Sequence, residues 1–203
     1  MKFLGGLLIA LVALHSTVAA EIQSTVSIFD GPKNFYKGGK EGSIGAGVFF
    51  SPFITKKRRP TANFTGPLVQ IGCMLNSPNP DASWRGNFEV SGELFGGGIV
   101  AGKGDYVANA TIWLRYNLLT PYWRIVPYLQ IGAGVTLTDA DQDAFGQTFN
   151  FNEGASIGVR YFIQPRCSIN AEFRCLHISN AGMAKENLGI NAQGGTLSVS
   201  WYF

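Results

Sequence analysis

The residues of this chain best suited to chemistry lie near its C-terminal end, in the run His177-Ile178-Ser179-Asn180-Ala181-Gly182. A serine nucleophile needs a base for its proton, and a histidine two residues away on the same face of a strand can reach it where the strand bends into a loop. Asn180, or main-chain amides around Gly182, could stabilise a developing oxyanion. The spacing permits a serine hydrolase, and it equally permits two interfacial residues that cap a strand.

The strand that leads into this motif has two different faces. From Cys167 to Ser179, the odd-numbered residues lie on one face of the strand, are mostly apolar and include His177. The even-numbered residues lie on the other face and include Glu172 and Arg174. His177 and Ser179 therefore belong to the apolar face. A water-soluble barrel would bury that face in its core, whereas a membrane barrel would turn it toward lipid.

The N-terminus has the layout of a secretory signal peptide. Lys2 precedes an apolar run over residues 3–14, and small residues lead to an expected cleavage near Ala20. We therefore expect residues 1–20 to be a signal peptide and the polar, poorly periodic residues 21–40 to be a periplasmic extension. No later apolar run approaches the roughly 20 residues of a spanning helix.

Residues 41–203 repeat an alternation of period two about eight times, each time with an apolar face and a small or polar face. The chain ends on Trp201-Tyr202-Phe203, which resembles the aromatic insertion signal of bacterial outer-membrane barrels. These features predict an all-β fold, an eight-stranded antiparallel transmembrane β-barrel of the outer-membrane type. A soluble lipocalin-like barrel, with the apolar side inward, is the alternative. The polar faces carry charges of both signs, which must pair in a narrow interior: Glu89, Glu93, Arg115, Arg160, Glu172 and Arg174.

Further polar residues are expected beside His177 on the lipid side. Asn191 lies on the same face of the last strand as its apolar residues, because it is separated from them by an even number of positions. Glu153 interrupts the apolar face of the sixth segment. A turn at residues 164–166 would place Glu153 opposite His177. His177 would lie about 25 Å from that turn, at the top of the apolar band. Polar groups that face lipid are costly, so this cluster is a candidate site.

A basic run lies in a predicted outer loop over residues 54–64. It could bind anionic lipid headgroups, or it could simply be a solvated face. The net charge of +3 is too small to indicate nucleic acid. The basic residues are Lys56, Lys57, Arg58 and Arg59.

The cysteines predict neither a disulfide framework nor a metal site. Cys73, Cys167 and Cys175 are an odd set, and the last two lie too far apart along one strand to form a disulfide. One histidine remains after the signal peptide, so there is no cluster of metal ligands. We expect no metal and no other cofactor.

The motif around Ser179, followed by Asn187-Leu188-Gly189-Ile190-Asn191 and a short terminal strand, resembles the C-terminal signature of the PagL-type lipid A 3-O-deacylase family, also called acyloxyacyl hydrolase. The resemblance is specific from about Glu172 to Asn191. It implies an eight-stranded outer-membrane barrel whose lipid-facing serine esterase site removes the 3-hydroxyacyl ester at position 3 of lipid A in lipopolysaccharide. It also implies Ser179 as nucleophile, His177 as general base, and Asn180 with the Gly182 region as oxyanion support.

One position departs from the pattern of that family. The family has a glutamate after the Gly-Ile pair, and this chain has Asn191. An amide can orient a histidine but cannot stabilise the imidazolium with a full charge. Glu153 is a possible substitute acid, or a solvated residue at the headgroup boundary.

The sequence thus predicts a carboxylic ester hydrolase in the bacterial outer membrane that acts on lipid A. The alternative is a catalytically weak or inactive small barrel with a structural or lipid-binding role. A small pore is disfavoured by the charged interior. The expected partners are lipopolysaccharide and the outer membrane, without nucleic acid, and a homodimer is left open.

Overall fold

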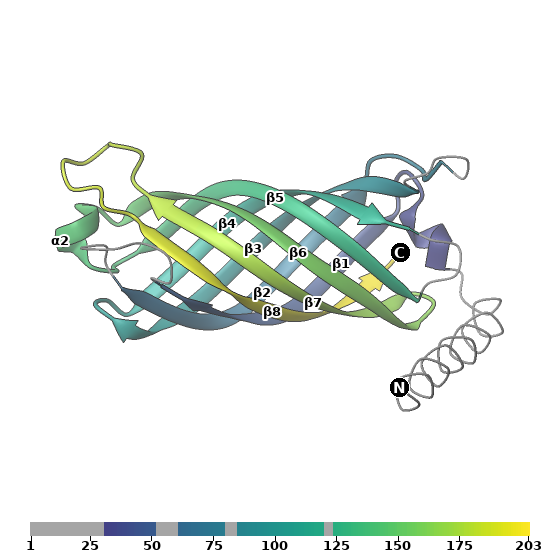
Figure 1. Cartoon of the computed structure of the whole chain (residues 1–203), viewed down its shortest axis with the longest axis horizontal. Helices are drawn as coiled ribbons and strands as arrows, with labels where there is room; N and C mark the ends of the chain where they lie inside the picture. The colour runs from purple at the N-terminus through teal and green to yellow at the C-terminus, as the bar shows by residue number, and fades with distance from the viewer. Residues whose placement is uncertain (1–30, 52–60, 80–84, 120–123) are drawn as a thin grey trace, which may run out of the picture.

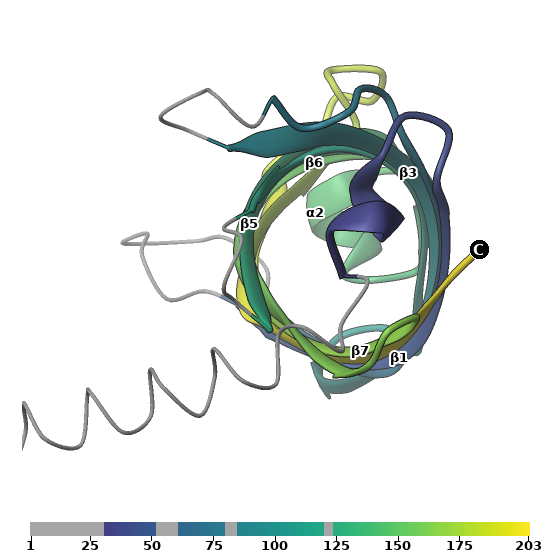
Figure 2. The same cartoon turned by 90° about the vertical axis from the view of Figure 1, so that its right-hand side faces the viewer.

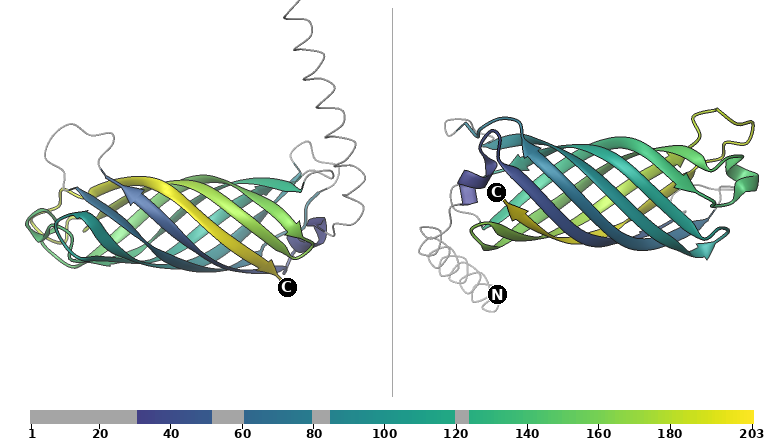
Figure 3. Two further views of the ribbon diagram at one scale, coloured as in Figure 1. Left: turned by 90° about the horizontal axis from the view of Figure 1, so that it is seen from below. Right: turned by 180° about the vertical axis from the view of Figure 1, so that it is seen from behind.

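The computed structural model describes residues 31–51, 61–79, 85–119 and 124–203. They form a closed barrel in which each strand pairs antiparallel with its neighbours in sequence, and β8 closes the barrel against β1 (Figures 1 and 3). The predicted fold is therefore confirmed. The strands are β1 (Lys40–Phe50), β2 (Ala62–Met74), β3 (Gly86–Gly102), β4 (Tyr106–Leu118), β5 (Ile125–Thr138), β6 (Phe149–Gln164), β7 (Cys167–Ser179) and β8 (Ile190–Tyr202).

Three sequence predictions fall wholly or partly outside the described residues. The signal peptide over 1–20 and the basic run Lys56–Arg59 are not described, and the extension over 21–40 is described only from residue 31. This last part forms the short helix η1 (Gly31–Phe35) and packs against one end of the barrel.

The outer wall of the barrel is apolar along its length. Large side chains such as Ile71 (72% exposed), Leu197 (65%) and Ile131 (59%) point outward from their strands. Leaving so much apolar surface in water would be costly, so this wall suits a lipid environment. None of the helices among the described residues is long and apolar enough to cross a membrane.

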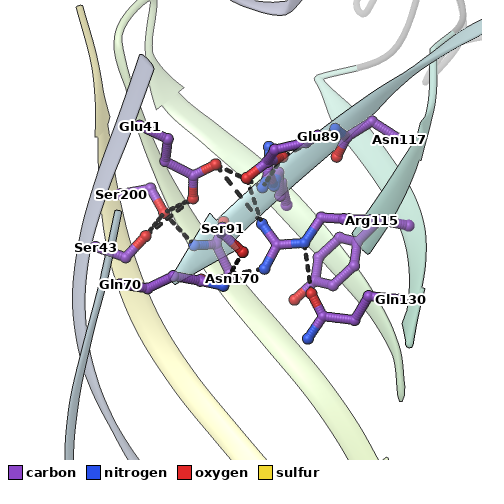
Figure 4. Close-up of polar contacts among 12 residues, drawn as sticks. Glu41, Ser43, Gln70, Glu89, Ser91, Arg115, Asn117, Gln130, Asn170 and Ser200 are labelled. Atoms are coloured by element: carbon purple, nitrogen blue, oxygen red, sulfur yellow. Dashed lines mark hydrogen bonds and ion pairs between the residues drawn. The ribbon is translucent and has the colours of Figure 1, made fainter. Parts of the chain in front are cut away.

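The middle of the interior is filled by paired charges. Arg160 Nη2 lies 2.6 Å from Glu41 Oε2 and 3.0 Å from Glu89 Oε2, and Arg115 Nη1 lies 3.2 Å from Glu89 Oε1. Figure 4 shows the Arg115 guanidinium between the two glutamates and Gln130, whose Oε1 accepts from Arg115 Nε at 2.7 Å. All of these side chains are buried. Burial without such pairing would be very costly.

A second group of charges lies nearer to the candidate site. Arg174 binds Glu93 through two hydrogen bonds of 2.6 and 2.9 Å and Glu172 through one of 2.7 Å. The guanidinium also lies 4.4 Å from the centre of the Trp113 ring, which favours a cation–π contact. The predicted pairing of the interior charges is thus confirmed, and Glu41 joins it although it precedes the clearly periodic part of the first strand.

Both ends of the interior are apolar, which the alternation of the strands does not reveal. At one end Phe49 stacks on Phe64 with ring centres 5.1 Å apart, and both contact Phe95. The expected outer loop over 54–64 therefore ends earlier, because β2 already begins at Ala62 and turns Phe64 inward. At the other end Phe35 of η1 packs against aromatic rings of β6 and β8, and Figure 2 shows η1 across that mouth.

The links between strands fix the orientation of the barrel. At one end, β6 and β7 are joined by Pro165 and Arg166 alone, β4 and β5 by residues 119–124, and β2 and β3 by the longer link 75–85. At the opposite end, one link is short, over 103–105, and three are long, over 51–61, 139–148 and 180–189. Outer-membrane barrels have short periplasmic turns and longer outer loops, so the end with Arg166 faces the periplasm. The link between β6 and β7 is shorter than the expected 164–166, but a bulge between Phe162 and Gln164 restores the register.

Candidate functional site

His177 lies on the outward face near the outer end of β7. The strand register places Asn191 of β8 directly opposite it, and His177 Nδ1 lies 2.5 Å from Asn191 Oδ1. An amide oxygen can only accept a hydrogen bond, so Nδ1 carries the proton of the neutral ring. Nε2 then has a free lone pair, which is the state that a general base requires.

Ser179 follows His177 on the same face of β7 and lies opposite Phe151 of β6. Both side chains of the Ser-His pair are half-buried. Within the described residues the Ser179 hydroxyl makes no hydrogen bond, so it is available to a substrate. A histidine next to a serine at the end of a strand can support acyl transfer when its ring nitrogen comes within hydrogen-bond distance of the serine hydroxyl.

Gly189 borders the free edge of the His177 ring. Its φ is +64°, and a methyl group at this position would lie 3.1 Å from His177 Cε1, 3.5 Å from Nε2 and 3.0 Å from the carbonyl oxygen of Ile178. A side chain would therefore press on the ring beside Nε2. The sequence analysis did not assign a role to Gly189, although a glycine just before a strand signals a special main-chain conformation.

The chain turns sharply after Ser179. Ala181 has φ +54° and Gly182 has φ +82°, and Met183 N–H donates to the carbonyl oxygen of Asn180 at 3.1 Å. Gly182 N–H donates to Asn180 Oδ1 at 2.8 Å. Two successive left-handed residues therefore bring the main chain of this turn next to Ser179.

The side chain of Asn180 is fully buried and points away from lipid. Its Nδ2 donates to the carbonyl oxygens of Phe145 at 2.7 Å and Glu186 at 2.6 Å. Its main-chain N–H donates to Asn187 Oδ1 at 3.1 Å. The amide that sequence reasoning assigned to an oxyanion thus joins two outer loops, and Gly182 N–H is engaged by the same side chain.

The partner loop is ordered by its own contacts. It contains the helix α2 (Gln142–Phe145), and Leu188 N–H donates to the carbonyl oxygen of Ala144 at 3.1 Å. Asp139 begins this loop and accepts hydrogen bonds from the N–H groups of Tyr106 and Asp105, which lower the pKa of the Asp139 carboxyl. No local pattern of residues indicates that this loop supports the turn after Ser179.

Glu153 lies opposite His177 on β6, on the side away from Asn191. Its side chain is exposed, and in the described part of the chain it makes no hydrogen bond or ion pair. The expected register is therefore observed, without a contact to the ring.

An apolar groove of about 990 Å³ runs along the outer wall below this cluster. On β7 it is lined by Ala171 and Phe173, and only Cys175 separates Phe173 from His177 on that face. Leu197 of β8 and Ile157 of β6 form further parts of its lining. Its position and its apolar lining suit a hydrocarbon chain.

The cysteines are free. Cys73, Cys167 and Cys175 form no disulfide. Across the described residues, no group of three or more His, Cys, Asp or Glu side chains could hold a metal ion.

A closed eight-stranded barrel with an apolar outer wall and a filled, charge-paired interior defines an outer-membrane β-barrel. Residues 69–200 match the family described as lipid A 3-O-deacylase (PagL). The match spans more than half of the chain, and the chain belongs to this family.

Three solved structures that are similar to this chain are named for one enzyme and two other proteins. Neisserial surface protein A shares 15% identity at a TM-score of 0.59, over 82% of this chain and 100% of its own. The outer membrane enzyme PagL shares 18% identity at a TM-score of 0.45, over 79% of this chain and 97% of its own. The attachment invasion locus protein Ail of Yersinia pestis shares 13% identity at a TM-score of 0.48, over 82% of this chain and 99% of its own. The first likeness shows the fold alone, and no curated protein matches the sequence significantly.

Proposed function

We propose that this protein is a serine esterase of the outer membrane that removes the 3-hydroxyacyl chain attached by an ester to position 3 of lipid A. The observation that carries the proposal is the His177–Asn191 pair on the lipid-facing wall, next to an unengaged Ser179 hydroxyl. Membership of the lipid A 3-O-deacylase family supports the choice of substrate.

Ser179 is the nucleophile and His177 is the general base. Ser179 Oγ attacks the ester carbonyl carbon while His177 Nε2 takes the hydroxyl proton. As the tetrahedral intermediate collapses, the bond to the sugar oxygen breaks, and His177 returns the proton to that oxygen. Water, deprotonated by the same nitrogen, then hydrolyses the acyl-enzyme and releases the 3-hydroxy fatty acid.

The oxyanion is supported by the main chain of the turn after Ser179. Asn180 Nδ2 and Gly182 N–H are held in internal hydrogen bonds, so the Ala181 N–H is the donor of this turn that has no partner among the described residues. Asn180 acts as a positioning residue, because its side chain fixes the turn that presents this N–H.

Asn191 is also a positioning residue, since it holds the His177 ring in the tautomer with a free Nε2. Glu153, in register with His177, is our candidate for the charge that Asn191 lacks. A carboxylate directly opposite a histidine on the neighbouring strand can reach the imidazole ring by rotation of its side chain. The groove below the cluster receives the acyl chain, whose ester would then lie near Ser179.

The test is mass spectrometry of lipid A from a Gram-negative host that produces the full chain. We expect loss of one 3-hydroxyacyl group, and no loss with Ser179→Ala or His177→Ala. Cys175→Ala, on the same face of β7, is the matched control and should act like the unchanged protein. Heat-dependent electrophoretic mobility verifies that each barrel is folded in the outer membrane.

Unchanged lipid A with all four folded proteins would contradict the esterase proposal. It would favour a structural or lipid-binding barrel, a function consistent with an uncharged amide where the family has a carboxylate. Deacylation that persists in Ser179→Ala would refute the assignment of the nucleophile.

A further inference from the structure

The periplasmic rim carries one basic residue at the start of every strand that rises from it. Lys40 is the first residue of β1, and the residues immediately before β3, β5 and β7 are Arg85, Arg124 and Arg166. The lysine and the arginines before β3 and β7 are exposed, and Arg124 is half-buried. The cations are therefore distributed around the whole circumference rather than gathered on one side.

The main chain fixes each of these four positions. Lys40 N–H donates to the carbonyl oxygen of Phe203 at 3.0 Å. The carbonyl oxygens of Arg85, Arg124 and Arg166 accept from the N–H groups of residues on neighbouring strands or at their ends, at 2.6, 3.0 and 3.1 Å. The ring of cations is thus part of the barrel and does not depend on loop conformation.

Among the described residues, no ion pair joins Lys40, Arg85 or Arg166 to a carboxylate side chain. Glu41 lies one step farther along β1, but its side chain points into the interior and binds Arg160. Lys33 and Lys37, on the segment that crosses the mouth, add exposed positive charge. The described loops at the opposite end are instead rich in carboxylates: Asp105, Asp139, Asp141, Asp143 and Glu186.

Aromatic side chains set the height of the ring in the membrane. Trp201 and Phe203 are 49% and 69% exposed on the outer wall, and Phe88 packs against Tyr116 with ring centres 4.9 Å apart. Tyr161 of β6 continues this belt. Aromatic belts of membrane barrels lie at the level of the headgroups. The cations, one or a few residues nearer the periplasm, therefore lie at the level of the lipid phosphates.

We propose that Lys40, Arg85, Arg124 and Arg166 form a binding ring for the phosphate groups of anionic phospholipids in the periplasmic leaflet. Arginine forks match phosphate geometry, and long basic side chains extend from an apolar wall to the headgroup plane. Because phospholipids surround the barrel laterally, a ring around the circumference fits them better than it fits a single soluble ligand. The ring lies at the opposite end of the strands from Ser179, so this proposal is independent of the esterase.

The test uses the full folded chain in zwitterionic detergent micelles, with phosphatidylglycerol or phosphatidylcholine added. Bound lipid is measured by native mass spectrometry. We expect a preference for phosphatidylglycerol that weakens about fivefold for each cation removed. The triple variant Lys40→Gln, Arg85→Gln, Arg166→Gln should therefore lose about a hundredfold. The variant Lys40→Arg, Arg85→Lys, Arg166→Lys should keep the preference, and Lys103→Gln at the other end is the control for position.

Three results would overturn the proposal. The unchanged protein could bind both lipids equally, the triple Gln variant could keep the preference, or inorganic phosphate at constant ionic strength could displace the lipid, which would make free phosphate the ligand. If the triple Gln variant does not fold, the unchanged protein decides. Its preference must fall between about 50 mM and about 500 mM salt, and a preference independent of salt contradicts the ring.

Discussion

His177 Nδ1 lies 2.5 Å from Asn191 Oδ1, and the register of β7 and β8 holds the two residues directly opposite each other. The amide oxygen fixes the ring tautomer and orientation but carries no net charge. In the proposed mechanism, this pair prepares His177 to accept a proton without fully compensating the charge that then develops on the ring.

Replacing Asn191 by glutamate should increase the rate of deacylation. A carboxylate keeps the acceptor and adds a full negative charge beside the imidazolium, so we expect kcat/KM to rise about tenfold. Asn191→Ala should lower kcat on the order of a hundredfold with little effect on KM. Release of 3-hydroxy fatty acid from purified lipopolysaccharide in mixed micelles measures both. An unchanged kcat in Asn191→Ala would show that the contact does not matter.

A side chain at position 189 should disturb the His177 ring. Gly189→Ala adds a methyl group 3.1 Å from His177 Cε1 and 3.0 Å from the Ile178 carbonyl oxygen, at φ +64°. We expect a fall in kcat of at least about tenfold in a barrel that still folds. Gly38→Ala, at the periplasmic end, is the matched control, since φ is +86° there and nothing lies within 4 Å of the added methyl group. Equal losses in the two variants would assign the effect to main-chain strain alone.

Removing the Asn180 amide should loosen the outer loops. In Asn180→Ala the carbonyl oxygens of Phe145 and Glu186 lose their donor, at a cost of about 1–3 kcal/mol for each one that stays buried. Asn180→Asp keeps the acceptor for Gly182 N–H but turns a carboxylate toward those carbonyls. Both variants should exchange amide hydrogens faster over residues 139–147 and 180–189. Unchanged exchange with reduced activity would instead support a direct role of the side chain in the reaction.

Breaking the interior charge network should weaken the barrel rather than the chemistry. Glu89→Gln leaves Glu41 as the only carboxylate of the described residues that pairs with both Arg115 and Arg160. Loss of one partner of a buried ion pair costs about 3–5 kcal/mol. Urea unfolding of protein refolded into vesicles should show this decrease in the free energy of unfolding, with the activity of the folded fraction preserved. A stability equal to that of the unchanged protein would contradict the network's role.

Glu153→Gln distinguishes a substitute acid from a solvated boundary residue. If the Glu153 carboxylate supports the imidazolium, the variant should lose about tenfold in kcat. Its stability should not change, because Glu153 is exposed and unpaired in the described structure. The double variant Asn191→Glu, Glu153→Gln should recover the loss, since the carboxylate then lies on the other side of the ring. Full activity of Glu153→Gln alone would remove Glu153 from the proposed mechanism.

The sequence predicts much of this arrangement because a strand has a fixed period of two. Parity alone places His177, Asn191 and Glu153 on the outer wall, and the link near Arg166 sets the register of Glu153 against His177. The same parity assigns the charged side chains to the interior, and both signs of charge indicate that they pair. These predictions depend only on distances along one strand or across one short turn.

Other features depend on contacts between distant segments and leave no periodic signal. Asn180 Nδ2 reaches Phe145 across two loops, so its inward orientation could not be read from the neighbours of Ser179. The apolar layer around Phe49 and Phe64 interrupts the polar interior because two inward phenylalanines fill the space together. Loop packing and volume filling are properties of the folded barrel, and no local pattern encodes them.

The filled interior has a consequence for the way in which a substrate arrives. Phe49, Phe64 and Phe95 occupy one end, paired charges the middle and Phe35 the other end. For the proposed esterase, the filled interior leaves lateral diffusion within the outer leaflet as the route by which a lipid reaches Ser179. The fluidity and packing of the leaflet then become rate-determining variables, and the same barrel in a dilute detergent micelle works at a different effective substrate concentration, expressed per area of membrane rather than per volume of solution.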